Sequence, residues 1–423
     1  MNNKLRILFL WPPEMPYDLT LHHHYTILGE TAAYFIDKPE YQVDIFDGGV
    51  LNYLKKEYIQ KLLNRYDYLI ILSYVHNTHS AIRAAQICKE ITPNTNIIAY
   101  GPSCYYVPQF FGKPIFDAYI WAGDPELGIE SFIKYKEKLI DEKELSGVVV
   151  NSRGYKAKPK YLEPDLWAFP PLKELPLNGY DRIISNKKTI RKFGKRQISL
   201  TVSRGCPFNC EYCFATQMYG GKERRRPVDK TIKYIKDNKE YFNAIQMFSP
   251  NFTYDKKWVR EFCQQLIKEN IKFSWRCTTR ITLLDEEIVK IMANAGCKSV
   301  GIGIESLQED IQQEIHKVQS THQVIKTIKM LKKVGINAKC YIMLGLPGQT
   351  KKDVLKTIKL IKDSGGEVRP SSYSPYHLLT KKSTLSEVSA MNRYTYKINS
   401  VEGLASVEYL KIIFNRDFNI NED

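Results

Sequence analysis

Short apolar runs alternate with polar and amphipathic stretches through the first 150 residues of the chain. The runs expected to be strands are 5–10, 42–46, 68–73, 96–101 and 118–121. Segments of helical character lie between them, notably 79–92. Alternating strands and helices predict a parallel sheet with helices on both faces. We therefore expect residues 1–150 to form a Rossmann-like α/β domain.

Ligands of open α/β sheets bind at the carboxyl ends of the strands. The loops expected at those ends contain the candidate contact residues Ser73, Tyr74, Gly101, Pro102 and Gly123.

The alternation stops at 151–195, where proline and lysine become frequent, and this composition predicts a linker strap. It resumes over 196–380 with longer helices. The strands expected there are 197–203, 244–248, 273–280, 299–304, 338–344 and 367–373. Six strand–helix units predict a partial (β/α)6 barrel with its site at the carboxyl ends of the strands. Residues 381–423 are expected to form a small helical cap.

The charge pattern changes this picture little. The 423 residues include 62 Lys and Arg against 46 Asp and Glu, a formal net charge of +16. Such an excess can indicate nucleic-acid binding. Much of it lies along helical stretches whose lysines form solvated faces, so nucleic acid is not the expected partner. A denser Arg-rich run at 222–227 is expected either to be scaffold or to contact an anionic group.

The chain shows no sign of a membrane span. No apolar run approaches the ~20 residues needed to cross a bilayer, and the N-terminus lacks a signal-peptide pattern. Six of the nine cysteines are scattered singly, as expected of reduced thiols. We expect a cytoplasmic protein.

The other three cysteines, Cys206, Cys210 and Cys213, are spaced C-x3-C-x2-C. Thiolates are soft ligands that suit iron–sulfur clusters and zinc. A zinc site would need a fourth Cys or His at close spacing, and none follows Cys213 nearby. Three thiolates on a 4Fe-4S cluster would leave one iron open to a small molecule. A structural metal knot and an unrelated cluster are the alternatives.

Tyr212 and Phe214 flank the last of these cysteines, and the whole motif resembles that of the radical SAM superfamily. The resemblance implies a 4Fe-4S cluster whose open iron binds S-adenosylmethionine. It also implies cleavage of that molecule to methionine and a 5′-deoxyadenosyl radical, with an external electron donor such as flavodoxin or ferredoxin.

Later strand ends extend the resemblance. The run 301–306 resembles the family's ribose contact, with Glu305 accepting hydrogen bonds from ribose hydroxyls and Gly303 permitting close approach. Leu346 lies in a Gly-Leu-Pro-Gly segment that resembles the adenine contact, with simple turn chemistry as the alternative. Arg280 matches the family's Thr-Arg pair and is expected to hold the methionine carboxylate or the substrate, or to form an ion pair on the barrel floor.

Two segments depart from the family's pattern. Ser249 and Asn251 stand where relatives usually have two carboxylates, which puts proton handling from that strand in doubt. Both side chains can still hydrogen-bond the methionine end of S-adenosylmethionine. Tyr376 and His377 replace a Pro-Gly-Thr segment, and they are candidate catalytic residues facing the substrate.

The N-terminal domain is similar to the cobalamin-binding domain of the cobalamin-dependent radical SAM family. The similarity rests on an early Trp-Pro-Pro, on Tyr-Gly-Pro after the fourth strand and on Gly-Asp-Pro-Glu after the fifth. It implies that Ser73, Tyr74, Gly101, Pro102 and Gly123 contact cobalamin. The Asp-x-His-x-x-Gly signature of many cobalamin proteins is absent after the first strand. A degenerate domain that serves only substrate binding or dimerisation is the alternative.

These resemblances imply an enzyme that methylates an unactivated carbon of its substrate. The substrate is expected to be a small molecule or a peptide, and it can be anionic. Radical rearrangement, epimerisation, dehydration or cyclisation without net methyl transfer is the second hypothesis. A binding or regulatory protein with a structural cluster is the third.

Overall fold

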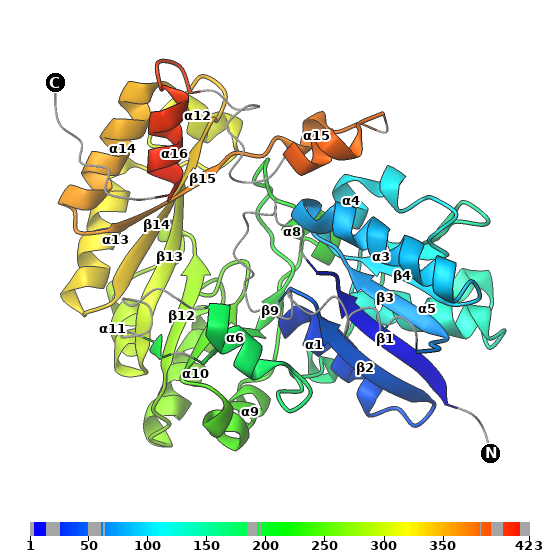
Figure 1. The fold of residues 1–423 in the computed structure, drawn as a ribbon. Helices are drawn as coiled ribbons and strands as arrows, with labels where there is room; N and C mark the ends of the chain where they lie inside the picture. The colour runs from blue at the N-terminus through cyan, green and yellow to red at the C-terminus, as the bar shows by residue number, and fades with distance from the viewer. Residues whose placement is uncertain are drawn as a thin grey trace.

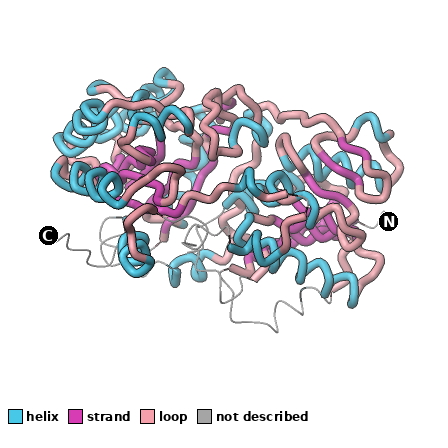
Figure 2. Tube along the Cα trace, turned by 90° about the horizontal axis from the view of Figure 1, so that it is seen from above, coloured by secondary structure: helices cyan, strands magenta, loops and turns pink. Residues whose placement is uncertain are grey.

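The structure is a computed structural model, and it describes residues 4–13, 26–49, 61, 64–183, 193–194, 196–380, 382–390 and 401–414. The chain folds into two lobes that lie side by side, the N-terminal lobe in blue and cyan and the second in green to orange (Figure 1). Seen from above, each lobe has strands at its centre and helices around them (Figure 2).

The N-terminal lobe is built on a seven-stranded sheet of order β2-β1-β3-β4-β5-β6-β7. Its strands are β1 (Leu5–Trp11), β2 (Tyr41–Asp47), β3 (Tyr68–Leu72), β4 (Asn96–Tyr100), β5 (Ala118–Ile120), β6 (Val148–Val150) and β7 (Tyr155–Lys156). The first five are parallel, whereas β6 and β7 add an antiparallel edge. The sheet therefore continues past residue 150, where the domain was expected to end. The local sequence does not reveal this extension, because β6 pairs with β5, which lies about 30 residues earlier in the chain.

Apolar side chains on both sides of the sheet draw helices onto both faces. Helices α1 (Thr26–Ile36) and α5 (Pro125–Lys136) contribute to one core cluster, and α3 (Thr78–Ile91) contributes to the other. All five residues of β3 are buried, as expected for a central strand of a parallel sheet. The expected Rossmann-like architecture is confirmed.

The second lobe is an open sheet of six parallel strands in the order β15-β14-β13-β12-β11-β8. Its strands are β8 (Gln197–Thr201), β11 (Ala244–Phe248), β12 (Ser274–Thr279), β13 (Cys297–Glu305), β14 (Asn337–Leu344) and β15 (Glu367–Ser372). Helices α9 (Val228–Asn238), α10 (Lys256–Lys268), α11 (Glu286–Asn294), α13 (Thr321–Lys333) and α14 (Lys351–Asp363) pack on its outer face. This is the expected partial barrel.

The strands of the second lobe carry different residues on their two faces. On β13, Val300, Ile302 and Ile304 are fully buried against the outer helices. The alternate positions Gly301 and Gly303 face away from those helices, since successive side chains of a strand point to opposite faces. We call the face away from the helices the inner face.

The C-terminal helices are divided between the lobes. The Tyr409 hydroxyl of α16 (Ser406–Phe414) donates to Ser372 Oγ at 2.7 Å, which fixes this helix beside β15. In contrast, Val388 of α15 (Leu385–Ala390) is fully buried in the N-terminal core. The expected cap thus covers β15 with one helix and joins the two lobes with the other. Among the described helices, none is long and apolar enough to span a bilayer.

Candidate active site

The three-cysteine motif forms a loop between a short strand and a short helix. Strand β9 (Ser203–Arg204) pairs antiparallel with β10 (Arg224–Arg225), and α8 (Ala215–Tyr219) lies between them in sequence. Gly205 has a φ of 81°, and a Cβ there would lie 2.1 Å from the Lys222 carbonyl oxygen. The loop can therefore leave β9 only at glycine. Inside the loop, the Thr216 hydroxyl donates to the carbonyls of Cys206 at 3.0 Å and Phe208 at 2.6 Å.

Two side-chain donors point at the cysteine sulfurs. Asn251 Nδ2 donates to Cys206 Sγ at 3.3 Å, and a guanidinium N–H of Arg280 donates to Cys210 Sγ at 3.0 Å. Such donors stabilise charged sulfur and tune the potential of iron–sulfur centres. Burial raises the pKa of the Cys206 and Cys213 thiols, so metal binding here must release protons.

The donor set fits a cluster better than a single ion. In the described part of the chain, no three His, Cys, Asp or Glu side chains converge on one metal position, as a tetrahedral zinc site requires. The thiolates of a cluster bind different irons, so they need not converge. Cys206, Cys210 and Cys213 are all free of disulfides and are the residues that would hold the cluster.

Beside the loop, Glu305 at the end of β13 forms a buried ion pair. Lys317 Nζ lies 2.7 Å from Glu305 Oε1, and the Tyr212 hydroxyl donates to the same oxygen at 3.1 Å. Lys317 also donates to the Tyr212 hydroxyl at 3.1 Å. Glu305 has a φ of 60°, a conformation that non-glycine residues adopt at a cost and that is common at functional sites.

Gly303 makes room for this pair. A Cβ at that position would lie 2.2 Å from Lys317 Nζ and 2.4 Å from Glu305 Oε1. The sequence indicated Tyr212, Gly303 and Glu305, and the structure brings all three together. Lys317 was missed, because a single lysine twelve residues downstream carries no local signal of its partner.

The other residues expected to contact the nucleotide are Leu346, Ser249, Asn251 and Arg280. Leu346 packs near Tyr212, whereas the other three lie beside the three-cysteine loop. Leu346 is buried in a small apolar cluster that Tyr212 packs against. The Ser249 hydroxyl lies 2.6 Å from Ser203 Oγ, so Ser249 and Asn251 both bond to the cluster-loop region. Arg280 stacks over the Phe208 ring at 4.3 Å while it bonds to Cys210.

Tyr376 packs against the N-terminal lobe. Its ring centroid is 4.4 Å from that of Tyr106 in α4 (Pro102–Tyr106), and Tyr106 lies 6.0 Å from Phe214 of the cluster loop. These aromatic contacts connect α4, the cluster loop and the turn after β15. The side chain of His377 lies outside the described residues.

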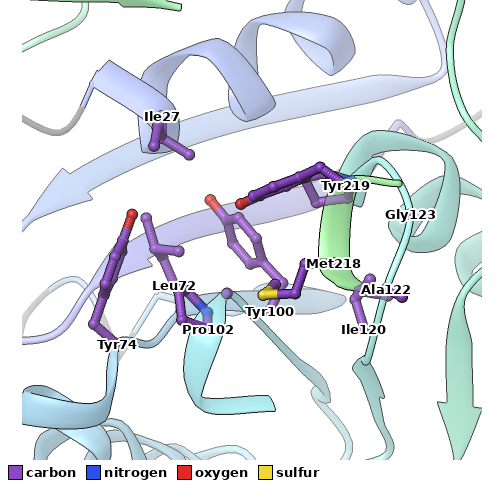
Figure 3. Close-up of a pocket in the computed structure, with 12 residues that line it drawn as sticks. Ile27, Leu72, Tyr74, Tyr100, Pro102, Ile120, Ala122, Gly123, Met218 and Tyr219 are labelled. Carbon is purple, nitrogen blue, oxygen red and sulfur yellow. The ribbon is translucent and has the colours of Figure 1, made fainter. Parts of the chain in front are cut away.

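A small pocket, partly open to solvent, lies where the two lobes meet (Figure 3). Four of the five expected cobalamin contacts line it, namely Tyr74, Gly101, Pro102 and Gly123. Ser73 does not line it; it is fully buried and its hydroxyl donates to Ser103 Oγ at 3.1 Å.

Helix α8 supplies the opposite wall of this cavity through Met218 and Tyr219, a few residues after Cys213. Further lining residues are Leu72 of β3, Ile120 of β5 and the buried Tyr100 of β4. The space suits an apolar ring or an edge of a larger organic group, which would have to extend beyond it. Histidine is absent from the described lining residues, in keeping with the missing histidine signature.

Buried ion pairs hold the lobes together next to the cluster loop. Arg204 donates two parallel hydrogen bonds to Glu126, at 2.9 and 2.8 Å, and Asp124 lies beside it. Arg224 donates to both oxygens of Asp124, while Glu30 accepts from the Thr201 amide at 2.9 Å. These carboxylates belong to the N-terminal lobe and these donors to the second lobe.

The Arg-rich run at 222–227 proves to be scaffold. Besides the Arg224 contact, Arg225 pairs with Glu223 at 2.7 Å. Arg226, one of the largest fully buried side chains, donates to the carbonyls of Thr201, Trp167 and Ala168 at 2.6 Å each. These arginines hold β10, the strap and the N-terminal lobe together.

The comparisons with known proteins agree with this geometry. Residues 200–361, from the end of β8 to α14, match the radical SAM superfamily. Residues 200–361 are thus the radical SAM domain of this chain. This segment holds the three cysteines as well as Glu305 and Lys317. A radical SAM domain implies that the protein uses a 4Fe-4S cluster and S-adenosylmethionine.

Among curated relatives, an uncharacterized methyltransferase of Pyrococcus horikoshii is 28% identical over 332 residues, which cover 77% of this chain and 70% of that protein. An anaerobic magnesium-protoporphyrin IX monomethyl ester cyclase of Rubrivivax gelatinosus is 25% identical over 302 residues; this chain spans about half of its length, 52%.

The solved structure of the radical S-adenosylmethionine methyltransferase TsrM from Kitasatospora setae, with cobalamin and a [4Fe-4S] cluster bound, has the same fold. Its TM-score is 0.67 at 12% identity, and the match covers 88% of this chain and 75% of that one. Both lobes of the chain are thus found together in a cobalamin-binding radical SAM enzyme.

Proposed function

We propose that this radical SAM enzyme is cobalamin-dependent and transfers a methyl group to an unactivated carbon of its substrate. The observation that carries the proposal is the placement of α8. This short helix follows the cluster loop directly and also forms a wall of the cavity at the strand ends of the N-terminal lobe. A cofactor in that cavity would lie beside the nucleotide site. The methyltransferases among the similar proteins support the same reaction.

Each group of residues has a role that follows from its position. Cys206, Cys210 and Cys213 would hold the cluster, and Asn251 and Arg280 would stabilise its sulfur ligands. When bound, the cluster supplies the electron that cleaves S-adenosylmethionine to methionine and a 5′-deoxyadenosyl radical.

Glu305 would orient the nucleoside. Its Oε1 is held by Lys317 and Tyr212, which leaves Oε2 to accept hydrogen bonds from the ribose hydroxyls. Leu346, buried close to Tyr212, would pack against adenine. On the other side of α8, Tyr74, Gly101, Pro102 and Gly123 would contact cobalamin, which supplies the methyl group.

Anaerobic reconstitution tests the proposal. The protein should gain iron and sulfide, retain hydroxocobalamin through gel filtration, and form S-adenosylhomocysteine beside 5′-deoxyadenosine under strong reductant. Ala122→Phe, which fills the cavity, should abolish retention of hydroxocobalamin while iron content and binding of S-adenosylhomocysteine stay unchanged. Retention of hydroxocobalamin by Ala122→Phe at the wild-type level would contradict the assigned site.

A second reaction class is favoured by the similarity to the ester cyclase. In that case the enzyme would form a ring or rearrange its substrate without net methyl transfer. Formation of 5′-deoxyadenosine without S-adenosylhomocysteine would support this class against methylation.

A further inference from the structure

Helix α4 connects the two places at which the cofactors are proposed to bind. Gly101, which precedes the helix, and Pro102, its first residue, line the cavity of the N-terminal lobe. Tyr106, its last residue, lies beside the cluster loop, with its ring centroid 6.0 Å from that of Phe214, the residue after Cys213. Five helical residues span only about 7 Å. A substrate that reacts with both cofactors therefore has to come close to the end of α4.

Three aromatic rings from separate elements meet at this point, and we call them the aromatic wall. They are Tyr106 of α4, Phe214 of the cluster loop and Tyr376 of the turn after β15. The ring centroids of Tyr106 and Tyr376 are 4.4 Å apart, and the Phe214 ring stands almost perpendicular to that of Tyr106, at 83°. Each of the three side chains is half-buried, so each ring keeps a part that a ligand can reach. Helices α4 and α8 lie next to each other there, between the lobes (Figure 1).

The Tyr106 hydroxyl makes no hydrogen bond to the residues that the structure describes. Tyrosine hydroxyls in protein interiors usually have a partner, and the half-buried Tyr234 donates to the Pro170 carbonyl at 2.8 Å. Burial, and after it the neighbouring Tyr376 and Cys213, raise the pKa of the Tyr106 phenol. The hydroxyl therefore stays protonated, and it is a donor without an acceptor beside the cluster loop.

We propose that the aromatic wall binds the substrate and that the Tyr106 hydroxyl donates a hydrogen bond to an oxygen of it. This inference rests on the proposed function and names the chemical class of its substrate, a planar ring that carries a carbonyl oxygen. Aromatic side chains pack on flat rings through stacked and edge contacts. The hydrogen bond would fix the ring in one orientation next to both cofactor sites, as transfer between bound groups requires.

The same three rings also join the lobes, and this packing is the competing explanation of the wall. Tyr106→Phe separates the two roles, because it removes the hydroxyl and keeps the ring contacts with Tyr376 and Phe214. A purely structural wall would tolerate this change without any effect on ligand binding.

The test is equilibrium dialysis of the reconstituted full-length protein with benzamide, in the presence of hydroxocobalamin and S-adenosylhomocysteine. Benzamide joins a planar ring to a carbonyl, whereas cyclohexanecarboxamide carries the same amide on a saturated, puckered ring. The wild type should bind benzamide saturably and more tightly than cyclohexanecarboxamide. Tyr106→Phe should raise the Kd for benzamide about fivefold, as expected for the loss of one hydrogen bond between neutral groups.

The matched control is Tyr119→Phe, which removes the hydroxyl of a half-buried tyrosine on β5 that packs against the N-terminal core. Its Kd for benzamide should equal that of the wild type. The inference is overturned if benzamide does not bind saturably, if the two amides bind equally well, or if Tyr106→Phe and Tyr119→Phe have the same Kd.

Iron content and retention of hydroxocobalamin are measured on the same samples. Loss of hydroxocobalamin from a protein whose benzamide binding still depends on Tyr106 would contradict the proposed function alone. Normal cofactor binding without saturable benzamide binding would contradict only the aromatic wall as a substrate site.

Discussion

At the scale of single residues, Lys317 is the side chain whose role follows most directly from its surroundings. It is 6% exposed, and its ammonium bonds to both Glu305 and Tyr212. A buried charge is costly unless it is paired and hydrogen-bonded. Lys317 thereby pairs with Glu305 and holds its carboxylate in one orientation, as the proposed contact with ribose hydroxyls requires.

Lys317→Met should therefore weaken binding of S-adenosylhomocysteine about tenfold or more, because the proposed ribose acceptor loses the partner that orients it. Equilibrium dialysis measures the Kd, and iron content and visible absorbance should match those of the wild type. Lys351→Met, which breaks a half-exposed pair with Glu408, is the control and should bind normally. Unchanged affinity in Lys317→Met would show that the ion pair has only a structural role.

Glu130 in the N-terminal lobe allows a pH test. Burial alone would raise the pKa of its carboxyl, but hydrogen bonds from Lys38, Lys134 and Tyr34 outweigh burial and hold the pKa below its ordinary 4.5. Because the folded pKa is lowered, the stabilisation is present above pH 4.5 and is lost as the pH falls through the folded value. Glu130→Gln should lower the free energy of unfolding by about 1 kcal/mol at pH 7 and by less at pH 3. Urea denaturation at both pH values measures it, and an equal loss at both would contradict this account.

At the scale of elements, the cluster loop depends on its glycine hinge. Strands β9 and β10 pair antiparallel, and the chain passes under the Lys222 carbonyl at Gly205 to reach Cys206. The cysteines can therefore face their common site only while this turn keeps its positive φ.

Gly205→Ala should sharply reduce iron incorporation, because a Cβ meets backbone there and the left-handed conformation is strained. Iron and labile sulfide per protein after reconstitution give the measurement. Gly221→Ala, in the turn between α8 and β10, meets only a methyl group of Thr216 at 3.8 Å and should incorporate iron normally. Full iron loading in Gly205→Ala would mean that the loop can leave β9 by another path.

At the scale of the whole molecule, the cavity and the proposed nucleotide site lie side by side only because the lobes are docked. Residues Arg204 and Arg224 flank the cluster loop and bind Glu126 and Asp124 of the N-terminal lobe. Breaking a buried, hydrogen-bonded ion pair from one side leaves a desolvated charge. This docking should therefore contribute to both stability and cluster geometry.

Glu126→Gln should reduce stability by about 3 kcal/mol, since the buried Arg204 would lose the carboxylate that accepts its two hydrogen bonds and would keep only Asp124, at 3.4 Å. The midpoint of guanidinium denaturation measures the change. Lys233→Met, which removes an exposed pair with Asp237 on α9, should shift the midpoint little. Similar shifts in the two variants would indicate that the lobes are held by apolar contacts instead.

The sequence by itself determined the features that depend on residues close together in the chain, namely the strands and the three-cysteine motif. The periods of apolar positions predicted the five parallel strands of the first sheet and the six strands of the second, and C-x3-C-x2-C spacing with its flanking aromatics identified the cluster loop. Both are local patterns, read within one element or one turn. The sequence also indicated Glu305 and Gly303, because the six-residue run 301–306 contains both the expected end of a strand and its small residues.

The tertiary structure alone decided which distant residues meet. The pairing of Lys317 with Glu305, the engagement of the Arg-rich run by buried carboxylates and carbonyls, and the division of the C-terminal helices between the lobes all depend on lobe docking. Lobe docking cannot be recognised from residues adjacent in the sequence. Many alternative arrangements of the lobes would bury the same apolar surface, and they would differ only in which polar groups they bring together.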